Sequence, residues 1–454
     1  MRSYITRALS AAAAAGIAFL TVGFAGAGAP ATAAAPSLGP PVYTAQDAGY
    51  AAAGRWFRYV QTTVTVPPVT PATSGCNMIM GLHHAARMGE RADILVAQGG
   101  GAGSVGWGWG GQLTPFTITP KVGDQLQISV YYDRNGHTSF TATDVTQGVT
   151  RTVQVNTGAA IYNEVSLAGN ASSGPVAPPA ADTRLWAVAG THLTTYTGTR
   201  GTLTGPWQAS QQIQTSTGTA AGTVMRSPSG LWNGGANFGI WQRALPRALT
   251  NQIAGYEVYG NSFRFAATTL TVPTPLPATI AKGGASIEAG IMLNAPAERA
   301  QITMTPGGGS GSVTYRAGKS SAGALKLSPA AGDQVALSIY YDRQGHDFFT
   351  ATDTTQGTTD SVQVTVGNQN YNDVWLVGSA NNSALTPPPA DTQLWQFTGT
   401  HVTTYSGVHG TIQGPWNAAQ FIDTLHGAAS DPVVMDAPGL SNAGQDFTVW
   451  LRHW

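Results

Sequence analysis

A glycine-rich segment at residues 101–106 is the first stretch whose residue types could do chemistry, because its spacing matches GxGxxG. In a dinucleotide site this motif follows a strand and opens a helix within a βαβ unit. No helical pattern follows here. Ser104 also lies in an Ala-x-Ser-x-Gly arrangement, but a nucleophile elbow needs the same strand–turn–helix context. The segment therefore predicts a turn between strands, with no nucleotide cofactor and no serine nucleophile.

Histidines could bind a metal ion, but their spacing argues against it. His83 and His84 are adjacent, and neighbouring side chains on a strand point to opposite faces. No HExxH motif occurs. His137 and His346 each follow a hairpin turn at equivalent places in two similar stretches of the chain, which indicates a turn or packing role. We expect no metal site.

Cys76 is the only cysteine in the chain. An intrachain disulfide is therefore impossible. No local pattern of His and Asn supports a cysteine nucleophile, and the second half of the chain has Ala285 at the matching place. We expect Cys76 to be a small core residue.

The composition and the start of the chain indicate a secreted protein. Lys and Arg number 22, as do Asp and Glu, so the formal net charge is zero. A chain without a basic excess is a poor binder of nucleic acid. A basic start at Arg2 and Arg7, an apolar run over 11–24 and small residues at 31–33 predict a signal peptide cleaved after Ala33. A retained membrane anchor is the alternative. Oligomeric state is not indicated.

The second half of the chain repeats the first. Trp207 is matched by Trp416, 209 residues further on, and Trp241 is matched by Trp450 at the same spacing. A repeat of this length is a whole domain, whereas solenoid units have ~20–50 residues. We expect a first domain over 34–245 and a second over 246–454. The blocks that recur are Ala-Gly-Tyr (48–50 and 254–256), Thr-Val-Pro (65–67 and 271–273), Tyr-Tyr-Asp-Arg-x-Gly-His (131–137 and 340–346), Thr-Ala-Thr-Asp (141–144 and 350–353) and Gly-Pro-Trp (205–207 and 414–416).

Each copy has the pattern of an all-β domain. Bulky and polar residues alternate over 57–66, 125–132 and 334–341, as in half-buried strands. Asn135-Gly136 between two such runs is a strong hairpin signal. Many short strands separated by glycine-rich turns predict a β-sandwich or jelly roll in each copy.

These blocks resemble the glutamic peptidases (eqolisins, peptidase family G1, formerly A4). The resemblance covers most of each copy. It rests on Ala-Gly-Tyr, Thr-Val-Pro, Gly-Asp before a strand (123–124 and 332–333), Thr-Gln-Gly, and Tyr-Asn-Glu-Val at 162–165 followed by a proline-rich loop over 175–179. The resemblance implies a secreted, lectin-like β-sandwich endopeptidase that acts on polypeptides and needs no metal or cofactor.

The resemblance also implies a catalytic pair, Gln98 and Glu164, in the first copy. A carboxylate within ~2.6–3.2 Å of a water can take its proton and later protonate the leaving amine. A carboxamide N–H aimed at the carbonyl oxygen can stabilise its developing negative charge. Glu164 would hold the first role and Gln98 the second.

Both copies depart from the family pattern. In the second copy Pro306 falls opposite Gln98 and Asp373 falls opposite Glu164, which predicts an inactive copy. In the first copy Ile79 stands where the family has a cleft tryptophan, and Gln112 stands where an acidic residue is expected. Trp107, Trp109 and Gln112 are the residues we expect to bind substrate.

A non-enzymatic, lectin-like protein that binds polysaccharide or protein is the alternative. The altered cleft residues in both copies favour it. Trp107, Trp109 and Trp232 are not repeated in the second copy, and exposed aromatic rings suit sugar or peptide ligands. The repeated tryptophans, at 207, 241, 416 and 450, are expected in the core.

Overall fold

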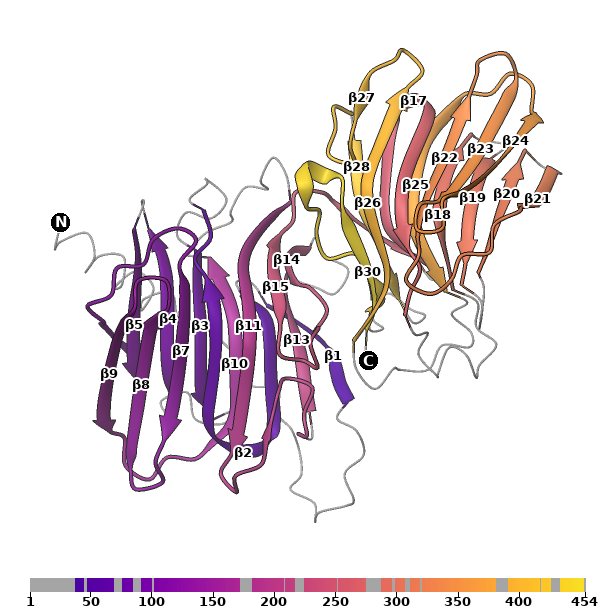
Figure 1. Ribbon diagram of the computed structural model, residues 1–454. Helices are drawn as coiled ribbons and strands as arrows, with labels where there is room; N and C mark the ends of the chain where they lie inside the picture. Colours follow the sequence, from indigo (N-terminus) through magenta and orange to yellow (C-terminus); the bar gives the residue numbers. More distant parts are fainter. Residues whose placement is uncertain are drawn as a thin grey trace. The chain divides into compact units, whose positions relative to one another are not determined.

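The computed structural model describes residues 37–44, 47–68, 76–84, 91–99, 102–171, 182–207, 209–216, 224–250, 252–274, 287–295, 299–306, 311–318, 321–380, 391–416, 418–425 and 433–452. These residues form β-strands, turns and one short 3₁₀ turn, so the predicted all-β sandwich class is confirmed (Figure 1). The predicted signal peptide lies outside the described residues. Within them, no helix is long and apolar enough to cross a membrane.

The chain divides into two compact units, and the second begins at Ala244, with Asp182 also belonging to it. The strands of the first unit are β1 (Ser37–Thr44), β2 (Asp47–Thr65), β3 (Cys76–His83), β4 (Arg91–Gly99), β5 (Ala102–Trp109), β6 (Gln112–Pro115), β7 (Gln125–Tyr132), β8 (His137–Asp144), β9 (Val149–Asn156), β10 (Tyr162–Ala171), β11 (Thr183–Thr195), β12 (Arg200–Gly201), β13 (Ala209–Ser216), β14 (Val224–Pro228) and β15 (Phe238–Gln242).

The second unit repeats this order. Its elements are β16 (Arg247–Thr250), β17 (Ile253–Thr271), β18 (Ile287–Asn294), β19 (Arg299–Thr305), β20 (Ser312–Ala317), β21 (Ser321–Leu325), β22 (Gln334–Tyr341), β23 (His346–Asp353), β24 (Thr358–Thr365), β25 (Tyr371–Ala380), β26 (Thr392–Thr404), β27 (His409–Gly410), β28 (Ala418–Leu425), β29 (Val433–Asp436), the 3₁₀ turn η2 (Asn442–Gly444) and β30 (Phe447–Leu451).

One long strand in each unit belongs to both layers of the sandwich. The first part of β2 pairs with β10 and β13, and its second part pairs with β7 and β11. Between these parts the exposed residues Gly54–Trp56 carry the chain from one layer to the other, and Gly54 has φ 86°. The layers pack face to face, because Met80 and Ile94 of one share a buried cluster with Ile128 and Phe140 of the other. The strand β17 is used in the same way.

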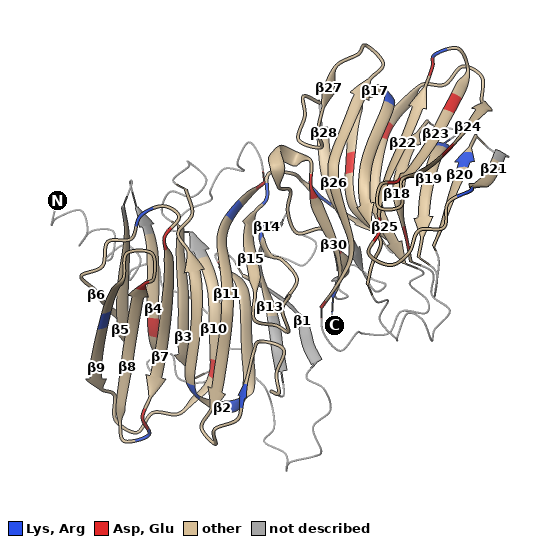
Figure 2. Ribbon diagram, in the orientation of Figure 1, with Lys and Arg blue, Asp and Glu red and all other residues tan. Residues whose placement is uncertain are grey.

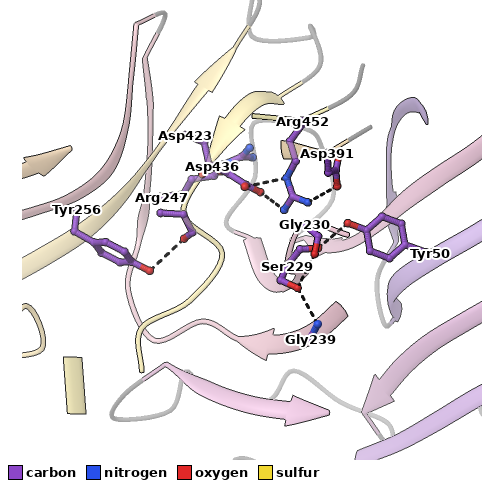
Figure 3. Close-up of polar contacts among 11 residues, drawn as sticks. Tyr50, Ser229, Gly230, Gly239, Arg247, Tyr256, Asp391, Asp423, Asp436 and Arg452 are labelled. Atoms are coloured by element: carbon purple, nitrogen blue, oxygen red, sulfur yellow. Dashed lines mark hydrogen bonds and ion pairs between the residues drawn. The ribbon is translucent and has the colours of Figure 1, made fainter. Parts of the chain in front are cut away.

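The recurring Ala-Gly-Tyr block fixes the start of β2 and β17. A Cβ atom at Gly49 would lie 2.0 Å from the carbonyl oxygen of Leu167, so only glycine allows β10 to approach this closely. The next residue, Tyr50, is fully buried and donates a hydrogen bond from its hydroxyl to the Ser229 carbonyl oxygen, 2.6 Å away (Figure 3). In the second unit Tyr256 donates to Ala437 at 3.2 Å. The block is therefore explained by packing.

The repeated hairpin turns have the structural role that the sequence predicts. The Asp133 carboxylate accepts hydrogen bonds from the backbone N–H groups of Asn135 and His137, and it contacts the His137 ring at 3.0 Å. Asp342 and His346 repeat the arrangement. No group of His, Cys, Asp and Glu in the described part of the chain could hold a metal ion.

Strand register corrects one sequence alignment. Cys76 lies opposite Ala171 of β10, and Ile287 lies opposite Ala380 of β25. The counterpart of Cys76 is therefore Ile287 and not Ala285. Cys76 is buried, as expected, and burial raises the pKa of its thiol. Such a thiol is a poor nucleophile.

Charged residues are sparse on both units (Figure 2). The second unit nevertheless buries a group of them. Arg452 forms ion pairs with Asp436 at 2.6 Å and Asp391 at 2.9 Å, and Arg247 pairs with Asp423 at 2.7 Å (Figure 3). Burial raises the pKa of Asp436 to about 6, although Arg452 opposes the rise. Arg452 therefore compensates two buried carboxylates at once.

We expect Arg452→Met to destabilise the second unit by about 3–5 kcal/mol, because it removes the positive charge that pairs with two buried carboxylates. Urea unfolding of the full chain measures the change. Lys326→Met, at an exposed position, is the control and should shift stability by less than about 0.5 kcal/mol. An unchanged unfolding midpoint for Arg452→Met would show that the ion pairs contribute nothing.

Candidate functional site

The strand β3 has two chemically different faces. Cys76, Met78, Met80 and Leu82 point into the core between the layers. The alternate residues Ile79, Gly81 and His83 therefore lie on the opposite face, which we call the outer face. Register extends this face to neighbouring strands, because Glu164 of β10 and Arg91 of β4 both lie opposite His83, while Asp93 lies opposite Gly81.

Four charged side chains meet on this outer face, which we call the His83 cluster: Glu164, His83, Asp93 and Arg91. The Nε2 atom of His83 lies 2.6 Å from Oδ1 of Asp93, and Nδ1 lies 3.9 Å from Oε1 of Glu164. Arg91 engages the other oxygen of Asp93 at 2.9 Å. The side chains of His83 and Asp93 are each 8% exposed, whereas Glu164 is 19% exposed. Glu164 is thus the carboxylate of the cluster that meets solvent.

The neighbours of His83 decide its charge. Burial alone would lower the pKa of His83, but the negative charges of Asp93 and Glu164 outweigh burial and raise it to about 9. Burial also tends to raise the pKa of Asp93, yet His83 and Arg91 hold it below its usual range. At neutral pH His83 is therefore an imidazolium between two carboxyl groups.

Gly81 makes room for this bridge. A Cβ atom at position 81 would lie 2.1 Å from Oδ1 of Asp93 and 2.8 Å from Nε2 of His83. Real Cβ atoms do not approach other atoms so closely, so the hydrogen bond between His83 and Asp93 passes where only glycine leaves space.

Gln98, the predicted partner of Glu164, lies near the end of β4, where its backbone pairs with Gly103. It is on the same sheet layer as Glu164, since β3 joins β4 and β10. The side chain of Gln98 is outside the described part of the structure, so its role stays a prediction.

The structure places Trp107 and Trp109 on the core side of β5. Trp107 lies opposite Ile94 and packs against Phe140, with ring centroids 5.3 Å apart. Trp109 packs edge-on against Tyr162. Both rings are partly buried against the core. We therefore correct their expected contact with substrate to a packing role, since strand alternation turns them away from Glu164.

Gln112 begins the edge strand β6, where it is exposed and pairs with Trp109. That strand is separated from β10 by β5, β4 and β3. The expected contact of Gln112 with a substrate bound at Glu164 is therefore not supported by its position. Trp232, also proposed as a ligand contact, is 40% exposed.

The second unit lacks every member of the His83 cluster except an arginine, Arg299. Register matches His83 with Asn294, Glu164 with Asp373, and Asp93 with Gln301. Asn294 donates a hydrogen bond to Asp373 at 2.7 Å, so the shorter carboxylate is held by a neutral amide. The same register aligns Ile94 with Ile302, because they pair with the equivalent residues Met80 and Ile291. Four residues further on, Gln98 aligns with Pro306.

His83 is the residue whose role the sequence did not reveal. As one of two adjacent histidines it was considered only as a metal ligand. The signal that could have indicated its role is that His83, Asp93 and Gly81 are all replaced in the second copy. These replacements can be recognised only from the strand pairing, because β3 and its counterpart β18 are offset by two residues relative to the rest of the repeat.

Solved structures provide a distant likeness. A scytalido-glutamic peptidase bound to a peptide-based transition-state analogue is 15% identical, with a TM-score of 0.34, and the match covers 44% of this chain and 97% of that one. SCP-B, an eqolisin-family peptidase in complex with the tripeptide Ala-Ile-His, is 15% identical over 43% of this chain and 97% of its own, with a TM-score of 0.34. No protein-family model and no curated protein matches the sequence.

We expect the stability of the first unit to fall as pH rises from about 6.5 to about 9, the ordinary and the folded pKa of His83. The folded state binds this proton more tightly than the unfolded chain, so the contribution is full below the lower value and lost above the higher one. The contribution of this proton to the free energy of unfolding amounts to at most about 3.5 kcal/mol, at ~1.4 kcal/mol per pKa unit. His83→Asn, which copies Asn294, removes it.

Denaturant unfolding of both full-length proteins across this pH range measures the effect. The difference in unfolding free energy between wild type and His83→Asn should shrink towards pH 9. Parallel stability curves for the two proteins would contradict a charged His83.

Proposed function

We propose that the first unit is a secreted endopeptidase in which Glu164 is the general base and acid. The observation that carries this proposal is the difference between two neighbouring carboxylates. Both oxygens of Asp93 are engaged, by His83 and by Arg91, and the side chain is buried. One carboxylate oxygen of Glu164 lies 3.9 Å from Nδ1 of His83, and the exposed part of the side chain is available to contact a water or a substrate.

Peptide hydrolysis needs a water that loses a proton as it attacks the carbonyl carbon. The Glu164 carboxylate takes that proton and passes it to the leaving amine, which restores the carboxylate for the next cycle. Negative charge builds up on the carbonyl oxygen meanwhile. The side-chain amide of Gln98 is proposed to donate a hydrogen bond to this oxygen.

The His83 cluster would orient Glu164 for this task. A catalytic group must be held within about 0.5 Å of its productive place by neighbours that are themselves fixed. His83 is fixed by Asp93, Asp93 is fixed by Arg91, and the imidazolium attracts the Glu164 carboxylate. We therefore assign His83 as a positioning residue, because it acts through Glu164.

The second unit is proposed to be non-catalytic. Asp373 is one methylene shorter than Glu164 and is bonded to Asn294 in place of a charged histidine. Pro306, opposite Gln98, has no side-chain amide. Export of the chain through residues 1–33 remains part of the proposal, and the N-terminal sequence of the secreted protein would test it.

Glu164→Gln should reduce hydrolysis of an unfolded protein substrate by at least about 10²-fold, because an amide cannot accept the proton of the attacking water. Asp373→Asn is the matched control in the second unit and should cleave like wild type. Both are assayed at acid and neutral pH, with circular dichroism to check folding. Cleavage that survives Glu164→Gln would reject the proposal and favour a binding protein.

Gln98→Ala should lower kcat by about 10²–10³-fold if Gln98 supplies an oxyanion hydrogen bond. Pro306→Ala, at the equivalent place in the second unit, should leave kcat unchanged. A normal kcat with a raised KM for Gln98→Ala would instead assign this residue to substrate binding.

A further inference from the structure

The second unit contains a cleft of about 740 Å³ on its outer face. Strands β25, β18, β19 and β20 form its base, and they lie next to one another in the sheet (Figure 1). This volume is within the ~300–1,000 Å³ typical of ligand sites. The cleft occupies the face on which the first unit carries the His83 cluster, as the matching register shows.

Strand register defines a low floor and two walls in this cleft. The floor is a row of buried residues that lie side by side, Val377, Gly290 and Thr303. A Cβ atom at Gly290 would lie 2.0 Å from the Ile302 carbonyl oxygen, so only glycine fits there and no side chain rises into the cleft at this point. Glu288 and Ser379 form the next row on one side.

The other wall is a row of four large side chains: Trp375, Met292, Gln301 and Arg316. Each lies opposite the next across β25, β18, β19 and β20. The same row in the first unit contains Ser166, Gly81, Asp93 and Gly108. This row therefore has mostly small residues in the first unit, and an aromatic, an apolar, a polar and a cationic side chain in the second. It lies where the first unit has the His83 cluster.

Two arginines place positive charge at one end of this cleft, whereas the carboxylates Glu288 and Asp373 line its other parts. Arg316 is exposed beside Gln301, and Arg299 is exposed two residues before Gln301 on the same face. Both line the cleft. Among the described residues neither forms an ion pair. Guanidinium groups bind carboxylates through paired hydrogen bonds, so the natural occupant of this end is an anionic oxygen group.

The neighbouring wall prefers an apolar group. Trp375 and Met292 are both half-buried and adjacent across β25 and β18. Indole and thioether side chains bind aliphatic and aromatic groups. A ligand that spans the cleft thus meets apolar surface and, two strands further along, positive charge. A peptide with an apolar residue close to a carboxylate contacts both regions, whereas a neutral sugar offers no negative charge to the arginines.

We propose that the second unit is a receptor that binds, without cleaving, acidic peptides in which an apolar side chain lies close to a carboxylate. The apolar side chain packs on Trp375 and Met292, and the carboxylate is bound by Arg299 and Arg316. This binding is independent of any cleavage by the first unit, so the two proposals fail separately.

The test uses full-length protein carrying Glu164→Gln, so that no probe is consumed. The probe is a fluorescein-labelled hexapeptide with a central phenylalanine followed by two aspartates, and the matched probe replaces the aspartates with asparagines. Fluorescence anisotropy measures Kd for each. We expect the acidic probe to bind at least tenfold more tightly, and added salt to reduce this preference.

Cleft variants locate the binding. Arg299→Gln combined with Arg316→Gln alters only exposed side chains and should weaken binding of the acidic probe at least tenfold. Trp375→Ser, which copies Ser166, should weaken both probes. Lys326→Gln removes an exposed charge outside the cleft and should bind like the parent protein.

Three results would overturn the proposal. The first is equal affinity for the two probes, and the second is unchanged affinity for the acidic probe in the double arginine variant. The third is that the acidic probe does not bind, whereas a neutral oligosaccharide binds and loses this binding in Trp375→Ser. Mass spectrometry of the probe after incubation with the Glu164→Gln protein checks that the second unit does not cleave it.

Discussion

The partial burial of charge on the outer face of β3, β4 and β10 is the constraint on which the candidate site depends. Charge that leaves water must be compensated by close partners. His83 and Asp93 meet this demand at 2.6 Å, and Arg91 completes the compensation of Asp93. Gly81 is required because any side chain would occupy the same space. Glu164 is the carboxylate that keeps more contact with solvent, and His83 is its charged neighbour at 3.9 Å.

The two units have equivalent strands but different outer faces. Equivalent strands keep their register, yet the outer face carries a chain of charges in one unit and a cleft with an aromatic wall in the other. The core side of the same strands remains apolar in both. The same strands therefore meet two separate demands, since their inward residues form the core of each sandwich while their outward residues differ between the units.

The sequence was sufficient for the fold because its signals are local. Period-two alternation, the Asn135-Gly136 hairpin and the repeated blocks required no knowledge of strand partners. The site depends on partners that are distant in sequence, and there the prediction was incomplete. The bridge from His83 to Asp93 joins two strands, and the orientation of Trp107 follows from its pairing with Ile94. The replacement of Cys76 was misassigned because a length difference between the copies shifts the register by two residues.

The sharing of β2 between both layers has a consequence for the resistance of the first unit to proteolysis. A strand that supplies backbone hydrogen bonds to both layers connects them, so its complete release breaks hydrogen bonds in each layer. Opening the sandwich at this strand is therefore costly. Proteolysis of a folded chain requires such local opening. This strand sharing thus favours resistance to proteolysis without any disulfide bond.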